Sequence, residues 1–182
     1  IKAAAVLNNA FSVAGGDGKT LIATDHPLGG GGSLANRATT MADLNETSLE
    51  DNLIGISTFT DDRGLNIALK GMKLIVPPQL VFVADRLLQS PGRTATSDND
   101  INAIANINSM LPEGYVVNHY LTDTDAYFIK TDCPDGFKYF ERSPMQTALE
   151  GDFDTGNMRY KARERYSFGY SNFRAVFGSQ GA

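Results

Sequence analysis

Glu150-Gly-Asp-Phe-Asp-Thr-Gly-Asn-Met-Arg-Tyr-Lys-Ala-Arg-Glu-Arg-Tyr-Ser-Phe-Gly-Tyr170 is a segment in which two kinds of side chain alternate from Met158 onward. One parity carries four cations, Arg159, Lys161, Arg163 and Arg165. The other carries Met158, Tyr160, Ala162, Tyr166, Phe168 and Tyr170, with Glu164 as its one charged member. Because successive side chains of a strand point to opposite faces, the segment predicts a long strand with one cationic and one aromatic face.

The cationic row, Arg159, Lys161, Arg163 and Arg165, is called the basic ladder below. Since like charges repel, we expect other groups to neutralise it, and we favour ion pairs between subunits. The candidate acids are Glu150, Asp152 and Asp154 just before the ladder, and Glu46, Glu50 and Asp51 on a predicted helix. The alternative is a solvated edge strand, where cations discourage aggregation. A third interpretation is nucleic-acid binding, because cations interleaved with Tyr suit a phosphate backbone.

The composition limits the possible classes of protein. The 182 residues suffice for one domain, or for a domain with a lobe. A net charge of −5 argues against a protein that binds nucleic acid by bulk charge. The single cysteine, Cys133, excludes an internal disulfide and a cysteine-built zinc site. The sequence has no apolar run long enough to span a bilayer and no signal-peptide pattern, and we interpret Ile1 as an internal start of a fragment or processed product.

The pattern of apolar residues predicts an α+β fold. Asp43 to Glu46 reads as a capping box that opens a helix over about 44–61, with Leu49, Leu53, Ile56 and Phe59 on one apolar stripe. A glycine-rich loop over 15–42, with a possible short strand at 21–24, is predicted to be mobile. Further helices are expected from Pro77 to before Pro91 and near 101–107, the latter capped by a turn at 97–100. Strands are expected at 65–76, 115–121, 126–131 and 137–142, before the final strand.

Catalytic and metal-binding motifs are weak. Val13 to Thr20 resembles a phosphate-binding loop only superficially, because Val13 stands where that loop needs glycine. His26, beside a proline, and Cys133, in a turn, read as structural, whereas His119 is the centre of the one enzyme hypothesis that we keep. Four acids, Asp123, Asp125, Asp132 and Asp135, could bind a hard cation but are typical of hairpin turns. The sequence therefore predicts no catalytic residue, metal ligand or cofactor.

The order of several segments resembles one known family. These segments are Asp25-His-Pro27, Asn36-Arg37, the predicted helix ending in Asp61-Asp-Arg-Gly64, Leu74-Ile-Val-Pro-Pro-Gln-Leu80, Asn118 to Ile129, and Gly151-Asp-Phe-Asp-Thr-Gly156 running into the ladder strand. In this order the chain resembles the C-terminal part of a tailed-bacteriophage major capsid protein with the Hong Kong 97-like fold, of the type of Mu-like prophage major head subunits. The resemblance extends from about Thr24 onward.

The resemblance implies a division into domains. Residues 1–71 would belong to a peripheral domain, with a spine-type helix at about 44–61 and the flexible loop at 15–42. Residues 72–142 would form an axial domain, with a central mixed sheet flanked by helices. Residues 143–182 would return to the peripheral domain as long strands. Under this resemblance we would expect the family's N-terminal arm and extended loop to be missing, since they need more chain upstream of the spine-type helix than is present.

The function that the resemblance implies is structural, not enzymatic. Copies of the chain would assemble into pentamers and hexamers of an icosahedral phage or prophage shell in the bacterial cytoplasm and remain in the virion. Partners would include other copies, and also a scaffold, a head maturation protease and a portal, with packaged DNA only an indirect partner and no membrane. The expected inter-subunit contacts are Arg159, Lys161, Arg163, Arg165, Glu150, Asp152 and Asp154. The alternatives are an α+β enzyme with a site near His119 and a nucleic-acid-binding module that uses the ladder.

Overall fold

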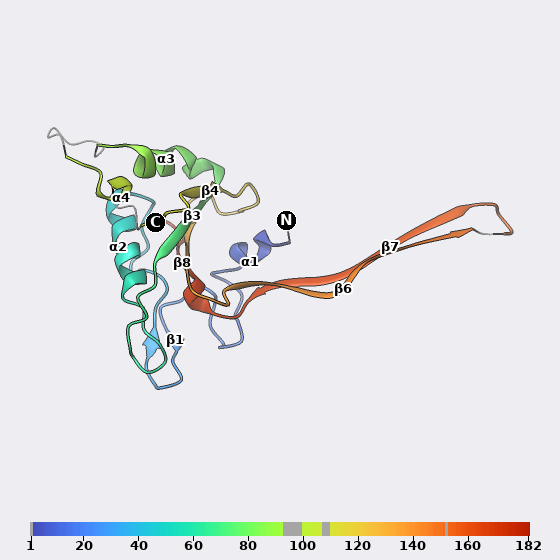
Figure 1. The fold of residues 1–182 in the computed structure, drawn as a ribbon, viewed down its shortest axis with the longest axis horizontal. Coiled ribbons are helices and arrows are strands. Elements are labelled where there is room, and N and C mark those ends of the chain that lie inside the picture. The colour runs from blue at the N-terminus through green and yellow to red at the C-terminus, as the bar shows by residue number, and fades with distance from the viewer. Residues whose placement is uncertain (1, 93–99, 107–109, 152) are drawn as a thin grey trace.

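The computed structural model describes residues 2–92, 100–106, 110–151 and 153–182. It has a body of α-helices and a mixed sheet, from which one long hairpin projects (Figure 1). The helices are α1 (Ala4–Asn8), α2 (Glu46–Ser57), α3 (Val81–Gln89) and α4 (Ala103–Asn106), with 3-10 turns η1 (Pro78–Leu80) and η2 (Phe173–Ala175). The strands are β1 (His26–Pro27), β2 (Ser33–Leu34), β3 (Gly71–Val76), β4 (Tyr115–Val117), β5 (Tyr127–Thr131), β6 (Phe137–Gly151), β7 (Met158–Tyr170) and β8 (Val176–Ser179). The prediction of an α+β class is therefore confirmed.

The centre of the body is a four-stranded sheet with the order β4-β3-β5-β8. β3 pairs in parallel with β4, whereas β3 with β5 and β5 with β8 are antiparallel. β5 is buried on both faces, since Tyr127 and Ile129 enter one apolar cluster and Phe128 enters another. The sheet thus lies between two cores.

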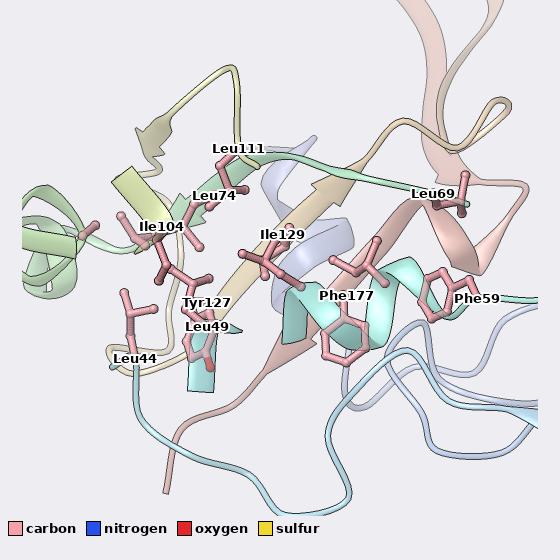
Figure 2. Close-up of a cluster of buried hydrophobic side chains, with 14 residues drawn as sticks. Leu44, Leu49, Phe59, Leu69, Leu74, Ile104, Leu111, Tyr127, Ile129 and Phe177 are labelled. Carbon is pink, nitrogen blue, oxygen red and sulfur yellow. The ribbon is translucent and has the colours of Figure 1, made fainter. Parts of the chain in front are cut away.

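The larger core fills the space between the sheet and α2 (Figure 2). Leu49, Leu53 and Ile56 of α2 pack there with Phe177 of β8, and Ile104 of α4 closes one end. On the other sheet face, Leu7 of α1 and the loop residues Leu21 and Ile22 contact Phe128. Two covered faces explain why so short a sheet has an apolar central strand.

The helix predicted over 44–61 is shorter in the structure, where it is α2, and its N-terminal cap is a different residue from the one predicted. The Asn45 side chain, not Asp43, accepts a hydrogen bond from the Ser48 amide at 2.9 Å, and the Ser48 hydroxyl accepts one from the Asn45 amide at 3.0 Å. The Asp43 carboxylate instead accepts a hydrogen bond from the Ala182 amide. The helix ends at Ser57, so Phe59 is buried but lies beyond it. The apolar stripe was predicted correctly, whereas the cap was shifted by two residues.

Parts of the glycine-rich loop at 15–42 pack against the body of the protein. Leu21 and Ile22 are each 1% exposed, and residues 21–24 form no strand. β1 and β2 form a small hairpin around the four glycines, and the Gly30 amide donates to the Asp62 carbonyl. Residues on either side of the glycines thus hold the loop against the body, and the mobility of the glycine run stays a prediction.

Strand boundaries also differ from those predicted. Residues 65–70 are outside any strand, and β4 stops at Val117. Helix α4 lies within the predicted 101–107 and is capped by Asn102, whose side chain accepts from the Ile104 and Ala105 amides. The predicted cap at 97–100 lies mostly outside the described residues. The largest difference is β6, which continues from 137 to 151 because β7 supplies hydrogen-bond partners along its length.

The buried Asn36 side chain joins the loop to the segment after the long hairpin. Its amide nitrogen donates to the carbonyls of Leu21, Phe173 and Val176, and its oxygen accepts from the Ala23 amide at 2.9 Å. Asn36 has no exposed surface. A polar side chain is tolerated there because it satisfies backbone groups that would otherwise be buried without partners.

His26 forms a second link between the same segments. The ring lies with Nδ1 2.6 Å from the Asp17 carboxylate and Nε2 3.2 Å from the Leu21 carbonyl, and it stacks on Phe173 at 3.9 Å. Beyond Phe173, the Arg174 side chain donates to the Thr60 carbonyl and pairs with Asp62 at 2.8 Å. The expectation of a structural, turn-associated His26 agrees with this buried position.

We expect Asn36→Ala to lower the free energy of unfolding by about 3 kcal/mol, because it leaves buried backbone groups without partners. Urea unfolding of the variant and the wild type measures the difference. Asn157→Ala, at an exposed position, is the matched control and should change stability little. A loss in Asn36→Ala no larger than in the control would contradict the assigned role.

We also expect the stabilising effect of the Asp17 carboxylate to depend on pH. Burial raises the pKa of Asp17, but hydrogen bonds from His26 and the Lys19 amide outweigh it and hold the pKa below its usual value. A lowered folded pKa means that the charge stabilises the fold above the unfolded pKa and that this contribution disappears as pH falls through the folded pKa. Urea unfolding of Asp17→Asn should therefore show a deficit at neutral pH that shrinks below pH 3.8, the ordinary aspartate value. A deficit constant over this range would contradict the prediction.

Candidate functional site

The long hairpin of β6 and β7, called the arm below, stands away from the body (Figure 1). The two strands pair antiparallel from Phe137↔Tyr170 to Gly151↔Met158. Register shifts between Glu141 and Gln146 insert extra residues into β6, around Pro144. Bulges of this kind bend and twist a hairpin and accommodate a proline in a strand.

The distal half of the arm, residues 144–151 and 158–165, is exposed on both faces. A two-stranded hairpin without further cover is marginally stable in water. It also exposes large apolar side chains, with Leu149 62%, Met158 70% and Tyr160 67% accessible. A surface of this kind is typical of a contact with another molecule.

The register assigns one chemistry to each face of the distal arm. Arg159, Lys161, Arg163 and Arg165 stand opposite Glu150, Ala148, Gln146 and Ser143 respectively. The other face pairs Met158, Tyr160 and Ala162 with Gly151, Leu149 and Thr147. The alternation predicted for β7 is thus present in the structure. The sequence alone did not reveal that residues 143–151 form the second strand beneath the ladder.

The basic ladder is only partly neutralised within its own chain. Glu150 stands opposite Arg159, so one predicted acid is brought to one cation. Among the residues that the structure describes, no ion pair involves Lys161, Arg163 or Arg165. Three cations in a row therefore remain available to an outside partner.

The remaining predicted acids differ in position. Asp154 lies in the turn at the tip of the arm, and Asp152 lies outside the described residues. The helical acids are on α2, on the opposite side of the body from the arm (Figure 1). Glu46, Glu50 and Asp51 therefore do not meet the ladder of their own chain.

The root of the arm packs against α1. Tyr139, Tyr166 and Phe168 form an aromatic cluster with centroid distances of 5.2–5.8 Å, and the Lys2 ammonium lies 4.9 Å from the Tyr166 ring centre. Two open hollows of about 390 and 400 Å³ flank α1 at this root. The aromatic face of β7 is therefore partly covered by α1 near the body and uncovered farther out.

The residues of the weaker motifs have local structural roles. The Lys19 side chain forms an ion pair with Asp25. In the glycine-containing turn that precedes Lys19, the Gly15 amide donates a hydrogen bond to the Lys19 carbonyl. His119 lies in an exposed turn after β4. Burial raises the pKa of the Cys133 thiol, which disfavours the reactive thiolate.

The four clustered acids mostly organise turns. Asp123 accepts hydrogen bonds from the Asp125 and Ala126 amides, Asp132 accepts one from the Lys70 amide, and Asp135 pairs with Lys138 at 3.0 Å. Within the described ranges, no group of three or more His, Cys, Asp or Glu side chains is placed to hold a metal ion. No described helix is long and apolar enough to cross a membrane.

We expect the distal arm to exchange its backbone amides faster than the central sheet in the isolated subunit. The arm's hydrogen bonds have no apolar core on either side, whereas β3 and β5 lie between two cores. Hydrogen–deuterium exchange by mass spectrometry should show peptides from 144–151 and 158–165 exchanging well before those from 71–76 and 127–131. Equal protection of the two regions would contradict an uncovered arm.

Comparisons with known proteins identify the family of this chain. The model of the family described as "Phage capsid protein" matches residues 1–178. No curated protein matches the chain. Among solved structures, the crystal structure of a virus-like particle from Pyrococcus furiosus is similar, with a TM-score of 0.46 and 12% identity over 79% of this chain and 55% of that one. This chain therefore spans little more than half the length of that structure. Because the family match covers nearly all residues, the chain belongs to the phage capsid protein family.

Proposed function

We propose that this chain is a major capsid subunit with a Hong Kong 97-like fold, whose copies assemble into an icosahedral shell that encloses phage DNA. The observation that carries the proposal, beyond the family, is the distal arm. It exposes a cationic face and an apolar face on two strands that have no core of their own. A neighbouring subunit would supply that core.

Charge favours another copy of the chain as the partner of the ladder. The arm, residues 137–170, contains six Lys and Arg against five Asp and Glu, whereas the rest of the chain contains ten against sixteen. An acidic body in one copy thus complements the ladder of the next. We expect the acids of α2, which lie far from the ladder of their own chain, to meet the ladder of such a neighbour. Glu150, Asp152 and Asp154 stay candidate contacts on the sequence alone.

The proposed contacts are individually weak. An exposed ion pair contributes about 0–1 kcal/mol and is screened by salt. Apolar area on the other face of the arm would contribute more, and repetition around rings of subunits would give the shell its strength. Weak repeated contacts also let a misplaced subunit dissociate before the shell closes.

We propose a domain assignment that follows the sheet. The division at 142 falls inside β6, so the arm over 137–170 is grouped as one unit of a peripheral domain. The mixed sheet with α3 and α4 would be the axial domain. Helix α2, expected in the peripheral part, packs on this sheet, and β8 returns to it after the arm, so we group both with the axial domain.

The remaining partners follow from this role. We propose that assembly takes place in the bacterial cytoplasm and involves a scaffold, a head maturation protease and a portal, with packaged DNA contacted only indirectly. A nucleic-acid-binding role for the ladder is the second candidate function, favoured by the exposed row of Lys161, Arg163 and Arg165. It differs from the first in requiring DNA binding by the isolated subunit.

We expect Arg163→Glu to reduce assembly strongly while leaving the stability of the subunit nearly unchanged. Arg163 is exposed and stands opposite the uncharged Gln146, so its reversal breaks no ion pair among the residues that the structure describes. Negative-stain electron microscopy and sedimentation measure assembly, and urea unfolding measures stability. Wild type should give closed shells or ring-like capsomers.

The matched control is Lys130→Glu, an exposed charge reversal on β5. Lys130 faces Lys73 across the strand pair, so the control should not destabilise the fold. Unfolding of the subunit by Arg163→Glu would contradict the interface role. DNA binding with a steep salt dependence, abolished by Arg163→Glu and without any assembly, would favour the second function.

A further inference from the structure

The two strands of the arm have unequal lengths between its root and its distal half. From Tyr166 to Arg163 β7 advances three residues, whereas between their partners, from Glu141 to Gln146, β6 advances five. β6 therefore carries two surplus residues, which correspond to roughly 7 Å of extended chain. They are divided between two bulges, one on either side of the pair Ser143↔Arg165.

A surplus of two residues preserves the faces of the arm. Because side chains alternate along a strand, one extra residue in β6 would exchange its two faces beyond the bulge, whereas a second restores them. At the root, Tyr139 stands opposite Phe168 on the aromatic face of β7. Beyond both bulges, Leu149 stands opposite Tyr160 on that same face. The bulges therefore change the path of β6 without exchanging the apolar face and the basic ladder.

The backbone, not side-chain packing, determines the path of the arm at the bulges. Four residues there are exposed and have no partner in the described register of the two strands, namely Arg142, Pro144, Met145 and Glu164. The aromatic cluster at the root ends at Tyr166, and the β7 residues beyond it are exposed. A bulge bends its strand and increases the local twist, and in Figure 1 the outer part of the arm runs at an angle to its root.

We propose that the two surplus residues of β6 aim the distal arm, so that they set the angle at which the basic ladder is presented to a neighbouring copy. This inference rests on the proposed assembly and adds the element that directs the arm. The number of residues matters more than their side chains, because the bend arises from the unequal lengths of the strands.

Removal of the surplus tests the inference. Deletion of Arg142 and Pro144 keeps every pair of the arm's register and places Met145 opposite Glu164 on the apolar face. The matched control, Arg142→Ala with Pro144→Ala, loses the same two side chains but keeps the surplus. Since regular pairing needs no bulge, both variants should unfold in urea close to the wild type.

A second variant removes the same number of residues in another way. Deletion of Pro144 and Met145, with Arg142→Ala, leaves Ala and Ser143 opposite Arg165 and Glu164. The substitution avoids two like charges directly opposite each other. Because the number of residues is what matters, both deletion variants should direct the arm alike. Unfolding of both, with a stable control, would overturn the inference, since the surplus would then be needed for pairing itself.

The direction of the arm is measured in the isolated subunit. In a Cys133→Ser background, spin labels are attached after Ile54→Cys on α2 and Asn157→Cys near the tip, both at exposed positions. Electron–electron double resonance gives the distance between the labels. Both deletion variants should shift the mean distance by several ångströms, whereas the control should match the wild type. Equal distances in the deletion variants and the control would overturn the inference.

Assembly supplies the second readout. Sedimentation and negative-stain electron microscopy should show particle yields at least about tenfold lower for both deletion variants, since a loss near 1.4 kcal/mol per contact already gives that factor. Deletion variants that redirect the arm but assemble like the control would overturn the inference and leave the capsid proposal intact. A wild-type chain that forms neither rings nor shells under any assembly condition would overturn the proposed function and the neighbour's part in the inference.

Discussion

The hydrogen bonds of the Asn36 side chain hold together segments that the chain brings from far apart. One amide nitrogen contacts the carbonyls of Leu21, Phe173 and Val176, which belong to the glycine-rich loop and to the segment that follows the arm. The side chain thus adds hydrogen bonds to the apolar contact that Val176 of β8 already makes with the second core. The direction in which the arm leaves the body also depends on it, because η2 is the point where β7 rejoins the sheet.

The groups beside Asn36 reinforce the same junction. Phe173 lies between the ring of His26 at 3.9 Å and the guanidinium of Arg174 at 4.7 Å, and Arg174 connects onward to Thr60 and Asp62. The arm thus departs from a base held by hydrogen bonds, an ion pair and ring stacking, although its own outer half has no core. Such a base suits an element that must reach a neighbour in a defined direction.

The sequence predicts some of this architecture well, for clear physical reasons. Alternation over 158–170 specifies a strand and its two faces, because a strand's geometry has a period of two. The stripe of Leu49, Leu53 and Ile56 specifies α2 in the same way. Both features are local, so one segment carries the whole signal.

Other features depend on partners distant in the chain. Residues 143–151 lack a clear alternation, and they form a strand only because β7 lies beside them. The anchoring roles of Asn36 and His26 require contacts more than a hundred residues away, with Phe173. The hollow of about 400 Å³ beside α1 is lined by residues of both α1 and β6, so no single segment of the sequence indicates it. For the ladder, the sequence identified the cations, whereas the structure shows that three of them meet no acid among the described residues of their own chain.

The central claim is that the distal arm is covered by another copy of the chain. Cryo-electron microscopy of assembled particles tests it most directly. The account predicts that residues 144–151 and 158–165 lie against a neighbouring subunit, with the ladder facing acidic groups and the apolar face buried. An arm that projects freely into solvent in the particle, or that folds back onto its own body, would contradict the account.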